Sequence, residues 1–423
     1  MKKSSKIFTI TLFSLFAILF NIVSGGGYTS LASATECGAT YTVDNTTNTI
    51  TLNKPTETEQ QQTETSASCI NQELENLDNN ITINLNGQKI VGDPEEGIYT
   101  IYITKTVIIE DTPTSGIITK GEVDSTIRVG SYDDSAITGS LTIKSGIFNE
   151  DIRTYNQGTT LTVEDGEFNG PIYNDDNGRG GSMVIVGGRF YYAIIQGTYE
   201  GCIDGSSSDL TISGGEFMFN GDGESFMGLI CGNTVISNGN FATTDTEQPI
   251  INVFVVPSMG YTPTLTITGG VFTSMGEINL GILTSSMADL KGKVSLQGGT
   301  FNKRIFVGSM TESDKDNISS DDIYNTLIPQ DYGLFYTDTN NLAKEFQYIG
   351  EIQTFSTTYV WLSDAGLSVY KIASDDEDPI IPVPDTGAIT KTSNDQVSSS
   401  TIVTAVLVGI VVAMTSACVL IKR

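Results

Sequence analysis

A single pattern of hydrophobic and polar positions returns seven times between residues 141 and 301. Five copies begin with an apolar, a small polar and an apolar residue, and the copies at 183–185 and 234–236 vary this start; all seven continue through a pair that contains glycine and end on a phenylalanine. These phenylalanines are Phe148, Phe168, Phe190, Phe217, Phe241, Phe272 and Phe301. They follow one another at intervals of 20, 22, 27, 24, 31 and 29 residues. A recurrence in this range is typical of repeat proteins, in which each copy folds as the same structural unit.

The pattern also predicts the local structure of each copy. In Leu141-Thr142-Ile143 the alternation places two apolar side chains on one face of a short strand and a polar one on the other. The pair that follows, here Ser145-Gly146, supplies residues that accept a positive φ, so the chain turns a corner. The phenylalanine after the corner then points inward. The repeated unit therefore predicts a parallel β-solenoid, with coils stacked at about 4.8 Å and an internal aromatic ladder.

Two earlier coils extend this solenoid toward the N-terminus. Residues 81–90 alternate in the same way and end on Ile90, and a second stretch runs from residue 107 to Ile118. Ile118 comes 28 residues after Ile90 and 30 residues before Phe148, so both isoleucines stand where phenylalanine stands later. We therefore predict an all-β fold with about nine coils over residues 81–308. At about 4.8 Å per step, such a stack is on the order of 40 Å long.

The first strands of a solenoid leave an unpaired edge, so a capping segment is expected before them. Residues 35–80 are the predicted N-terminal cap. Within it, residues 41–43 and 49–52 predict a hairpin, and the Thr-, Gln- and Glu-rich residues 54–67 predict a loop.

The other end of the solenoid is expected to carry its own cap, over residues 309–372. Its acidic, serine-rich residues 309–322 predict a surface loop, and residues 346–349 and 358–362 predict strands. Residues 373–400 follow as a predicted solvated linker, beginning with four consecutive acidic residues after Ser374.

Two stretches of this chain resemble a known family. The entry segment Ile83-Asn84-Leu85-Asn86-Gly87-Gln88-Lys89-Ile90, followed by the Leu-Thr-Ile-x-x-Gly-x-Phe coils, is similar to the right-handed parallel β-helix (pectin-lyase-like) surface proteins of monoderm bacteria. Residues 299–303, 323–327 and 332–335 resemble the segment that closes such helices. The resemblance implies a single-stranded right-handed β-helix. It implies no particular activity, because the fold serves both sugar-cleaving enzymes and non-catalytic adhesins.

Composition excludes several classes of function. The chain of 423 residues carries a formal net charge of −28, and residues 35–386 hold 49 acids and 16 bases, a net charge of −33. A nucleic-acid partner is excluded, because phosphate binding needs a basic face. The sequence contains no histidine. Ser-His-Asp and Cys-His sites and His-ligated zinc are therefore excluded, whereas carboxylate, Lys, Arg and Tyr chemistry stays open.

Residues 1–34 predict an export signal. Three lysines fall within the first six residues, an apolar run covers residues 8–23, and Ala32-Ser33-Ala34 is a small-residue cleavage site. Cleavage between Ala34 and Thr35 is expected. A retained membrane anchor is the alternative, which the short apolar run disfavours.

The C-terminal tail predicts anchoring to the cell envelope. Residues 401–421 form an apolar run long enough for a transmembrane helix, and residues 422–423 are a basic cytoplasmic end. Ahead of that run stands Val383-Pro384-Asp385-Thr386-Gly387, and the whole arrangement resembles a sortase sorting signal.

The sortase resemblance implies cleavage between Thr386 and Gly387 and transfer of the Thr386 carboxyl to an envelope amine. The implied partners are a sortase and that amine acceptor, and the implied location is extracellular and anchored to the cell surface. This tail departs from the usual signal in two ways: Val383 replaces the usual Leu, and the spacer of residues 388–400 is longer. A permanent membrane span remains the alternative.

Five cysteines are present, and Cys418 falls inside the predicted span. The remaining four are an even number in an exported chain, which favours disulfides, although four cysteines allow three pairings. Cys202 and Cys231 are 29 residues apart, about one coil, so we hypothesise that they pair. Cys37 and Cys69 would then close the N-terminal cap. The alternative is four buried reduced thiols that pack as small apolar residues.

The sequence presents paired carboxylates but no set of residues that converges on a catalytic or cofactor role. The pairs are Asp133-Asp134, Asp175-Asp176 and Asp321-Asp322. Residues 174–178 carry the oxygen ligands of a Ca²⁺ loop, but Ile185 stands where an EF-hand needs glutamate. Ordinary acidic turns are the favoured interpretation, and Arg179 in the adjacent Gly-rich turn is not distinguished as a base. We therefore predict no catalytic residue, no cofactor and no bound metal.

A ligand-binding role needs fewer groups than catalysis. Four tyrosines are expected on outer faces, where they stack on sugar rings: Tyr155, Tyr173, Tyr191 and Tyr192. The longer coils insert residues 249–263 and 278–293, and insertions often build the binding face of a solenoid. A threonine column suggests an ice-binding array, but it is one residue wide and Val184 interrupts it. Its members are Thr142, Thr162, Thr211 and Thr266.

These expectations combine into one functional hypothesis. The chain is a cell-envelope-anchored surface protein, and its predicted role is that of a non-catalytic adhesin or interaction protein that binds a glycan or a ligand on a host or neighbouring cell. The alternative is an extracellular polysaccharide lyase or glycosidase that acts through carboxylates on an outer face. Acid pairs converging beside Lys or Arg in one outer groove favour the enzyme, and scattered pairs favour binding.

Overall fold

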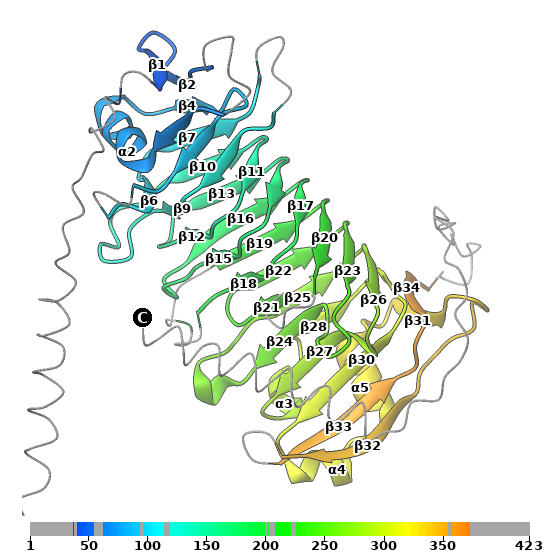
Figure 1. The fold of residues 1–423 in the computed structure, drawn as a ribbon. Coiled ribbons are helices and arrows are strands. Elements are labelled where there is room, and N and C mark those ends of the chain that lie inside the picture. The colour runs from blue at the N-terminus through cyan, green and yellow to red at the C-terminus, as the bar shows by residue number, and fades with distance from the viewer. Residues whose placement is uncertain are drawn as a thin grey trace, which may run out of the picture. The chain divides into compact units, whose positions relative to one another are not determined.

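The computed structural model describes residues 37, 40–54, 62–93, 97–113, 119–198, 202, 208–220, 226–353 and 357–372. The chain divides into Met1–Ala39 and Thr40–Arg423. Every helix and strand discussed below lies in the second unit, which is mostly β-structure (Figure 1).

Three long, largely parallel sheets run the length of this unit. Sheet 1 contains, in spatial order, β1 (Tyr41–Asp44), β2 (Thr49–Leu52), β4 (Ile81–Asn84), β7 (Thr106–Glu110), β10 (Ser140–Ile143), β13 (Thr160–Val163), β16 (Gly181–Ile185), β19 (Ser208–Ile212), β22 (Asn233–Ile236), β25 (Thr264–Ile267) and β28 (Val294–Leu296). Sheet 2 contains β3 (Glu64–Ser66), β5 (Lys89–Val91), β8 (Glu122–Asp124), β11 (Ile147–Phe148), β14 (Glu167–Phe168), β17 (Arg189–Phe190), β20 (Glu216–Phe219), β23 (Asn240–Thr243), β26 (Val271–Ser274), β29 (Thr300–Phe301), β34 (Leu367–Lys371) and β31 (Tyr332–Tyr336). Sheet 3 contains β6 (Thr100–Ile103), β9 (Thr126–Val129), β12 (Ile152–Thr154), β15 (Ile172–Asn174), β18 (Ile194–Gln196), β21 (Met227–Leu229), β24 (Ile251–Val255), β27 (Ile278–Thr284), β30 (Arg304–Ser309), β33 (Thr358–Ser363) and β32 (Phe346–Ile352).

The 27 strands from β4 to β30 form nine coils, each with one strand in every sheet. Successive coils pair in parallel and in register, so Leu141 stands beside Leu161, and Leu161 beside Met183. The early position assigned to Ile118 is wrong: Val123 pairs with both Ile90 and Phe148. Ile118 itself lies outside the described residues. The error arose because Gly121-Glu122-Val123 contains a single apolar residue, whereas the nearby pair Ile117-Ile118 is a stronger signal for a buried position.

The glycine pair serves two purposes at the corner between sheets 1 and 2. The second member takes the left-handed conformation in all seven copies, as at Gly188 with φ of 99°, which glycine adopts without strain. The first member is limited by space where it is glycine: a Cβ on Gly187 would lie 2.3 Å from the carbonyl oxygen of Glu164 in the preceding coil. The predicted positive φ is thus confirmed for the second residue. Where the first residue is glycine, a side chain is excluded because the backbone of the preceding coil lies too close.

The predicted aromatic ladder is confirmed. The seven phenylalanines are buried, and adjacent rings stack with centroids 4.4 to 5.1 Å apart and planes within 12° of each other. Because a parallel sheet repeats at about 4.8 Å, identical side chains on consecutive strands meet at stacking distance. Each such ring pair contributes about 0.5–1.5 kcal/mol beyond its burial. Ile, Leu and Val fill most of the remaining core, and a few buried polar residues such as Asn174 and Gln196 accompany them.

The N-terminal cap begins the stack as well as covering it. The predicted hairpin is confirmed, since β1 pairs with β2 in antiparallel fashion, but β2 and β3 already pair in parallel with β4 and β5. The loop expected over residues 54–67 instead includes β3, which leads into the helix α2 (Ala67–Asn76). Ser66 starts this helix by accepting a hydrogen bond from the Cys69 amide.

Helix α2 covers the free edge of β6. The side-chain amide of Asn71 donates to the Thr100 carbonyl and accepts from the Tyr102 amide, at 2.8 and 2.9 Å. It thereby replaces the peptide of a neighbouring strand, and the edge is closed to strand addition. This helix was not predicted from the sequence, because it is short and follows a Thr-, Gln- and Glu-rich stretch that was interpreted as a loop.

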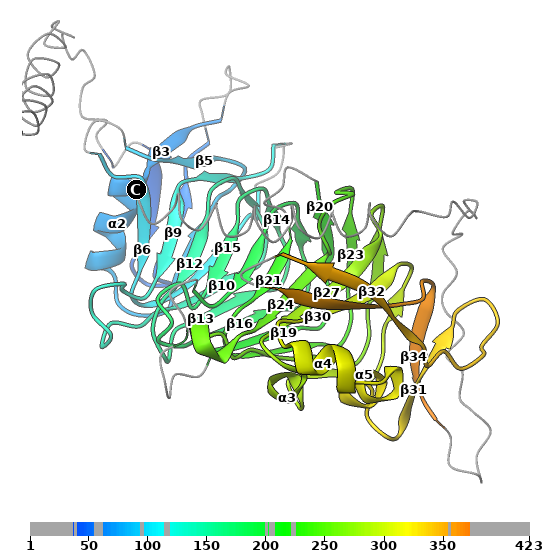
Figure 2. The same cartoon turned by 90° about the horizontal axis from the view of Figure 1, so that it is seen from below.

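The C-terminal cap closes the other end with antiparallel strands and helices (Figure 2). β33 pairs antiparallel with β30, and β34 with β29, and the expected strands at 346–349 and 358–362 are present within β32 and β33. The loop expected over 309–322 is wrong. It contains α4 (Glu312–Asn317) and the start of α5 (Ser320–Leu327), which Ser319 and Asp322 begin with a capping box. Short elements also interrupt the long coils, namely η2 (Pro257–Met259) and α3 (Met287–Leu290).

Candidate functional site

One column of outward-facing side chains on sheet 3 combines aromatic and basic groups. Tyr102, Arg128, Arg153 and Tyr173 stand in register on β6, β9, β12 and β15. Their neighbours along each strand, such as Ile127 on β9, point into the core. We call these four residues the Tyr–Arg column. The strand alternation that fills the solenoid therefore also places four functional side chains in one line, about 4.8 Å apart.

Arg153 is held from both sides by carboxylates. Its Nε donates to Asp151 and its Nη1 donates to Oδ2 of Asp176 at 3.0 Å. Its guanidinium also lies over the ring of Tyr173, 4.5 Å from the centroid. Burial lowers the pKa of Arg153, but the negative charges of Asp176 and Asp151 outweigh this, so the pKa is raised above its usual value. Arg153 is thus a fixed, permanently charged group.

Asp151 and Asp176 come from successive coils and converge on this arginine. Burial raises the pKa of Asp176, and Arg153 opposes that effect. Both oxygens of Asp151 are engaged, since Oδ1 accepts from the Thr126 hydroxyl at 2.6 Å and Oδ2 accepts from Arg153. The sequence did not single out Asp151, because its partner Asp176 lies 25 residues away and only the stacking of coils unites them.

Arg128 differs from its neighbour. Its Nε atom is buried and makes no hydrogen bond, and among the residues that the structure describes its guanidinium has no ion-pair partner. Asp151 and Asp176, which lie in the next two coils, accept hydrogen bonds from Arg153 and not from Arg128. Arg128 therefore presents donors without acceptors, on a partly buried side chain in the middle of the column.

The aromatic surroundings of the column are not the ones that the sequence predicted. Tyr155 was expected outside but is 2% exposed, because it sits in the turn that follows β12. Burial and then Asp176 raise its pKa. Tyr173, Tyr191 and Tyr192 are partly buried.

The exposed aromatic rings near the column lie in or beside the first coils. Tyr99 is 56% exposed, and Tyr102 and Tyr132 are each 48% exposed. The ring of Tyr132 packs edge-on against Tyr155, with centroids 5.7 Å apart, which ties this exposed ring to the buried cluster. A signal for Tyr102 existed in the alternation Thr100-Ile101-Tyr102-Ile103, where tyrosine takes the outward position.

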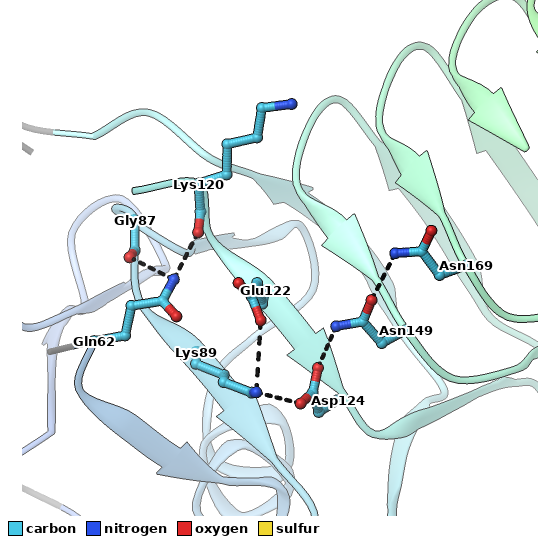
Figure 3. Close-up of polar contacts among 8 residues, drawn as sticks. All are labelled: Gln62, Gly87, Lys89, Lys120, Glu122, Asp124, Asn149 and Asn169. Atoms are coloured by element: carbon cyan, nitrogen blue, oxygen red, sulfur yellow. Dashed lines mark hydrogen bonds and ion pairs between the residues drawn. The ribbon is translucent and has the colours of Figure 1, made fainter. Parts of the chain in front are cut away.

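A second polar column, on the outer face of sheet 2, provides a contrast (Figure 3). The amine of Lys89 points between Asp124 and Glu122, and the Asn149 amide donates to Asp124 at 2.6 Å. Asn169 then donates to Asn149 at 2.7 Å. Each drawn member of this column has a partner, as does Gln62, which donates to two backbone carbonyls. These hydrogen bonds and ion pairs link successive coils to one another, so the polar groups of this column are used within the chain.

The acid pairs named from the sequence do not come together. Asp175 is 1% exposed and accepts from the Gly180 amide at 2.7 Å, whereas its neighbour Asp176 faces Arg153. Asp133-Asp134 lies in an exposed turn after β9, and Asp322 caps α5. Arg179 is exposed in the turn after Asp175, where its amide donates to Asn177. The pair Asp321-Asp322 lies apart on α5, whereas Asn156 links the other two turns by donating to the Asp134 carbonyl and accepting from Asn177.

The Ca²⁺-loop geometry considered for residues 174–178 is absent from the structure. Asn174 is fully buried and bonds to Thr154 and Gln196 inside the core, so its oxygen is turned away from Asp176. In the part of the chain that the structure describes, no group of three or more acidic or cysteine side chains is placed to hold a metal ion.

A disulfide joins Cys202 and Cys231, the pair that the coil spacing suggested. Cys37 and Cys69 are disulfide-bonded as well. The bond at Cys231 attaches residue 202 to the turn after β21, beside the apolar outer face of sheet 3.

The long coils also behave differently from the expectation. Val256 and Tyr261, in the inserted residues 249–263, are buried against sheet 3 and form part of its covering. The threonine column is in register on sheet 1, with Thr162 beside Val184 and Val184 beside Thr211, and Val184 is 36% exposed.

Several predicted features lie outside the described residues. These are the export signal with its cleavage site at Ala34 and Thr35, the sorting motif from Val383 to Gly387, and the apolar run at 401–421. Among the helices that are described, none has the length and apolar character needed to cross a membrane. Comparison with family models, curated proteins and solved structures found no match.

Proposed function

We propose that this protein is a cell-envelope-anchored β-helix that binds a surface glycan without cleaving it. The observation that carries this proposal is the Tyr–Arg column, in which Tyr102 is exposed, together with the exposed rings of Tyr99 and Tyr132. Exposed aromatic rings beside fixed polar groups are the combination that sugar rings use, with CH groups on the ring face and hydroxyls on the polar groups. The role proposed is that of an adhesin or interaction protein.

Display at the cell surface is supported by the chain's own signals. The export signal, the sorting motif centred on Thr386 and the apolar tail predict an anchored, extracellular protein whose C-terminus a sortase joins to an envelope amine. Disulfides are typical of oxidising, extracellular locations. Parallel strands joined by crossovers in one direction favour a right-handed coil. The column occupies the first four of nine coils, whereas the anchor follows the last.

An enzyme acting on the same glycan is the second candidate. A specific observation favours it: Asp151 and Asp176 converge beside Arg153 on one outer face, as paired carboxylates do in glycosidases, and burial raises the pKa of Asp176. Against it, both carboxylates are engaged in holding Arg153. They serve better as a clamp for the arginine than as groups free to transfer protons.

The test is a glycan-array screen of residues 35–386, with and without Ca²⁺, in which every bound glycan is then examined for cleavage products. We expect binding that survives Ca²⁺ removal and yields no product. New reducing or unsaturated ends that disappear in Asp176→Asn would replace the adhesin by the enzyme. Absence of binding to every glycan would remove both candidates.

A further inference from the structure

We propose that Arg128 is the anchor of an oxyanion site, and that the ligand of this protein carries a carboxylate or sulfate group on a sugar ring. The inference rests on the proposed glycan-binding function and specifies the chemistry that the column recognises. Its basis is the contrast between two arginines on adjacent strands, one of which is paired and one of which is not.

The two carboxylates beside the column, Asp151 and Asp176, already accept hydrogen bonds from within the chain. Asp151 spends its two oxygens on Thr126 and Arg153, and Oδ2 of Asp176 accepts from Arg153. Arg128 has no partner of its own among the described residues, and its Nε is sequestered from water. A buried donor without an acceptor costs about 1–3 kcal/mol, more when the group is charged. A ligand that supplies the acceptor recovers this cost.

The guanidinium of Arg128 also limits the type of acceptor. A guanidinium is a planar fork of donors that matches the two oxygens of a carboxylate or sulfate, and the pair gains from opposite charge. Some bases on the outer faces already have acidic partners within the chain: Lys89 has Glu122, and Arg189 has Glu216 at 3.1 Å. Arg304 shares with Arg128 a buried Nε that makes no hydrogen bond, but only Arg128 stands in register with Tyr102 and Arg153.

The exposed tyrosine rings beside Arg128 indicate which class of ligand bears the carboxylate or sulfate group. Arg128 stands beside Tyr102 in the register, and the rings of Tyr102 and Tyr132 are each 48% exposed, so they offer flat apolar surfaces next to the cation. A sugar ring fits such a surface. An extended peptide fits less well, because the edge of β6, where a strand would add, is occupied by Asn71. The geometry points to an acidic sugar.

The experiment uses the full secreted chain and three immobilised probes at equal density: sialyllactose, sulfated lactose and neutral lactose. The wild type is expected to prefer one or both acidic probes, and comparison of the two separates a carboxylate from a sulfate ester. Arg128→Ala should weaken binding to the preferred probe about tenfold or more, because the charge-assisted fork is lost. Arg128→Lys should recover only part of the loss, since an ammonium is a point charge.

The matched control is Arg189→Ala, which removes the same charge from the outer face of sheet 2, where Arg189 is paired with Glu216. It should change binding less than about twofold, as expected for an exposed ion pair. The melting temperatures of all variants serve to exclude unfolding.

Two outcomes overturn the inference. Equal binding to all three probes, unaffected by Arg128→Ala, leaves the glycan-binding function in place and removes Arg128 from it. If Arg128→Ala and Arg189→Ala weaken binding of the acidic probe equally, the net charge of the protein explains the effect and no specific site at Arg128 is needed. Absence of binding to any probe, together with an empty glycan array, contradicts the proposed function itself.

Discussion

The outer face of sheet 3 changes character halfway along the solenoid, although its backbone does not. In the first four coils the central outward column reads Tyr102, Arg128, Arg153 and Tyr173. In the next five coils the same column continues with smaller or apolar residues, namely Ile195, Gly228, Asn252, Gly281 and Phe306. The first region is open to solvent, whereas the second is covered.

The covering of the second region is built from the chain itself. Buried apolar residues from long coils, loops and the C-terminal strands pack on it, and they include Phe226, Ile230, Phe254, Val256, Tyr261, Leu283, Val360 and Leu362. The disulfide at Cys231 attaches residue 202 to the same cluster. Tyr173 and Tyr192 border it. One sheet face thus has a region that forms a second core and a region that this covering does not reach.

The repeat determines the backbone of every coil, whereas the residue at one outward position determines whether the face of that coil is covered or exposed. Each coil offers the same outward position, and an apolar residue there makes burial favourable at about 25 cal/mol per Å². A Tyr or Arg there keeps the position at the surface, because a guanidinium is costly to bury without partners. Insertions then accumulate over the apolar coils.

Truncating one aromatic residue in each region should separate them most clearly. Phe254→Ala removes a side chain that is 5% exposed in the covered region, and the cavity should lower the free energy of unfolding by about 3–5 kcal/mol. Tyr102→Ala removes one that is 48% exposed, and should change stability by about 0.5 kcal/mol or less. Urea denaturation of both variants measures the difference. Equal losses would mean that the first region is also a core.

Removal of the disulfide should weaken the covering specifically. Its cysteines are 29 residues apart, and closing a loop of that size restricts the unfolded chain by about 3 kcal/mol. The double variant Cys202→Ser, Cys231→Ser should therefore unfold at lower denaturant and bind a hydrophobic dye more strongly, while glycan binding by the first region is retained. Loss of glycan binding in a folded double variant would show that the two regions are not independent.

Acid titration should reveal a smaller effect that belongs to the first region. Burial raises the pKa of Asp175, in the turn after β15, to about 6. Because the folded state holds this proton more tightly than the unfolded state does, the contribution to stability is full below about pH 4 and is lost as pH rises through about 6. The loss amounts to roughly 2–3 kcal/mol.

Asp175→Asn is the matched variant for this titration. Asparagine keeps an acceptor for the Gly180 amide and tolerates the positive φ of 61° at this position. We expect it to equal the wild type near pH 4 and to exceed it in stability near pH 7. A wild-type stability that rises between these values, with no crossing by the variant, would contradict the assignment.

Sheets 1 and 2 were predictable because their signals are short-range. Alternation such as Leu141-Thr142-Ile143, a glycine that needs a positive φ, and an inward Phe148 all fall within eight residues. Sheet 3 was not, because its inward positions accept Thr, Asn and Gln as well as apolar residues, which hides the alternation. Those polar residues are tolerated inside because they bond to one another from coil to coil, as Asn174 does with Thr154 and Gln196.

The amino-acid sequence by itself determined the repeat, the number of coils and the inward aromatic ladder, because each depends on neighbouring residues. The export and anchoring signals stay predictions from the same sequence. Only the tertiary structure decided which outward side chains meet. Asp151 and Asp176, or Arg128 and Arg153, are each 25 residues apart and become neighbours only when coils stack. Coil lengths vary from copy to copy, so the register that pairs these residues is a property of the folded sheets. The same register decides that Arg153 meets two carboxylates while the Nε of Arg128 has no hydrogen-bond partner.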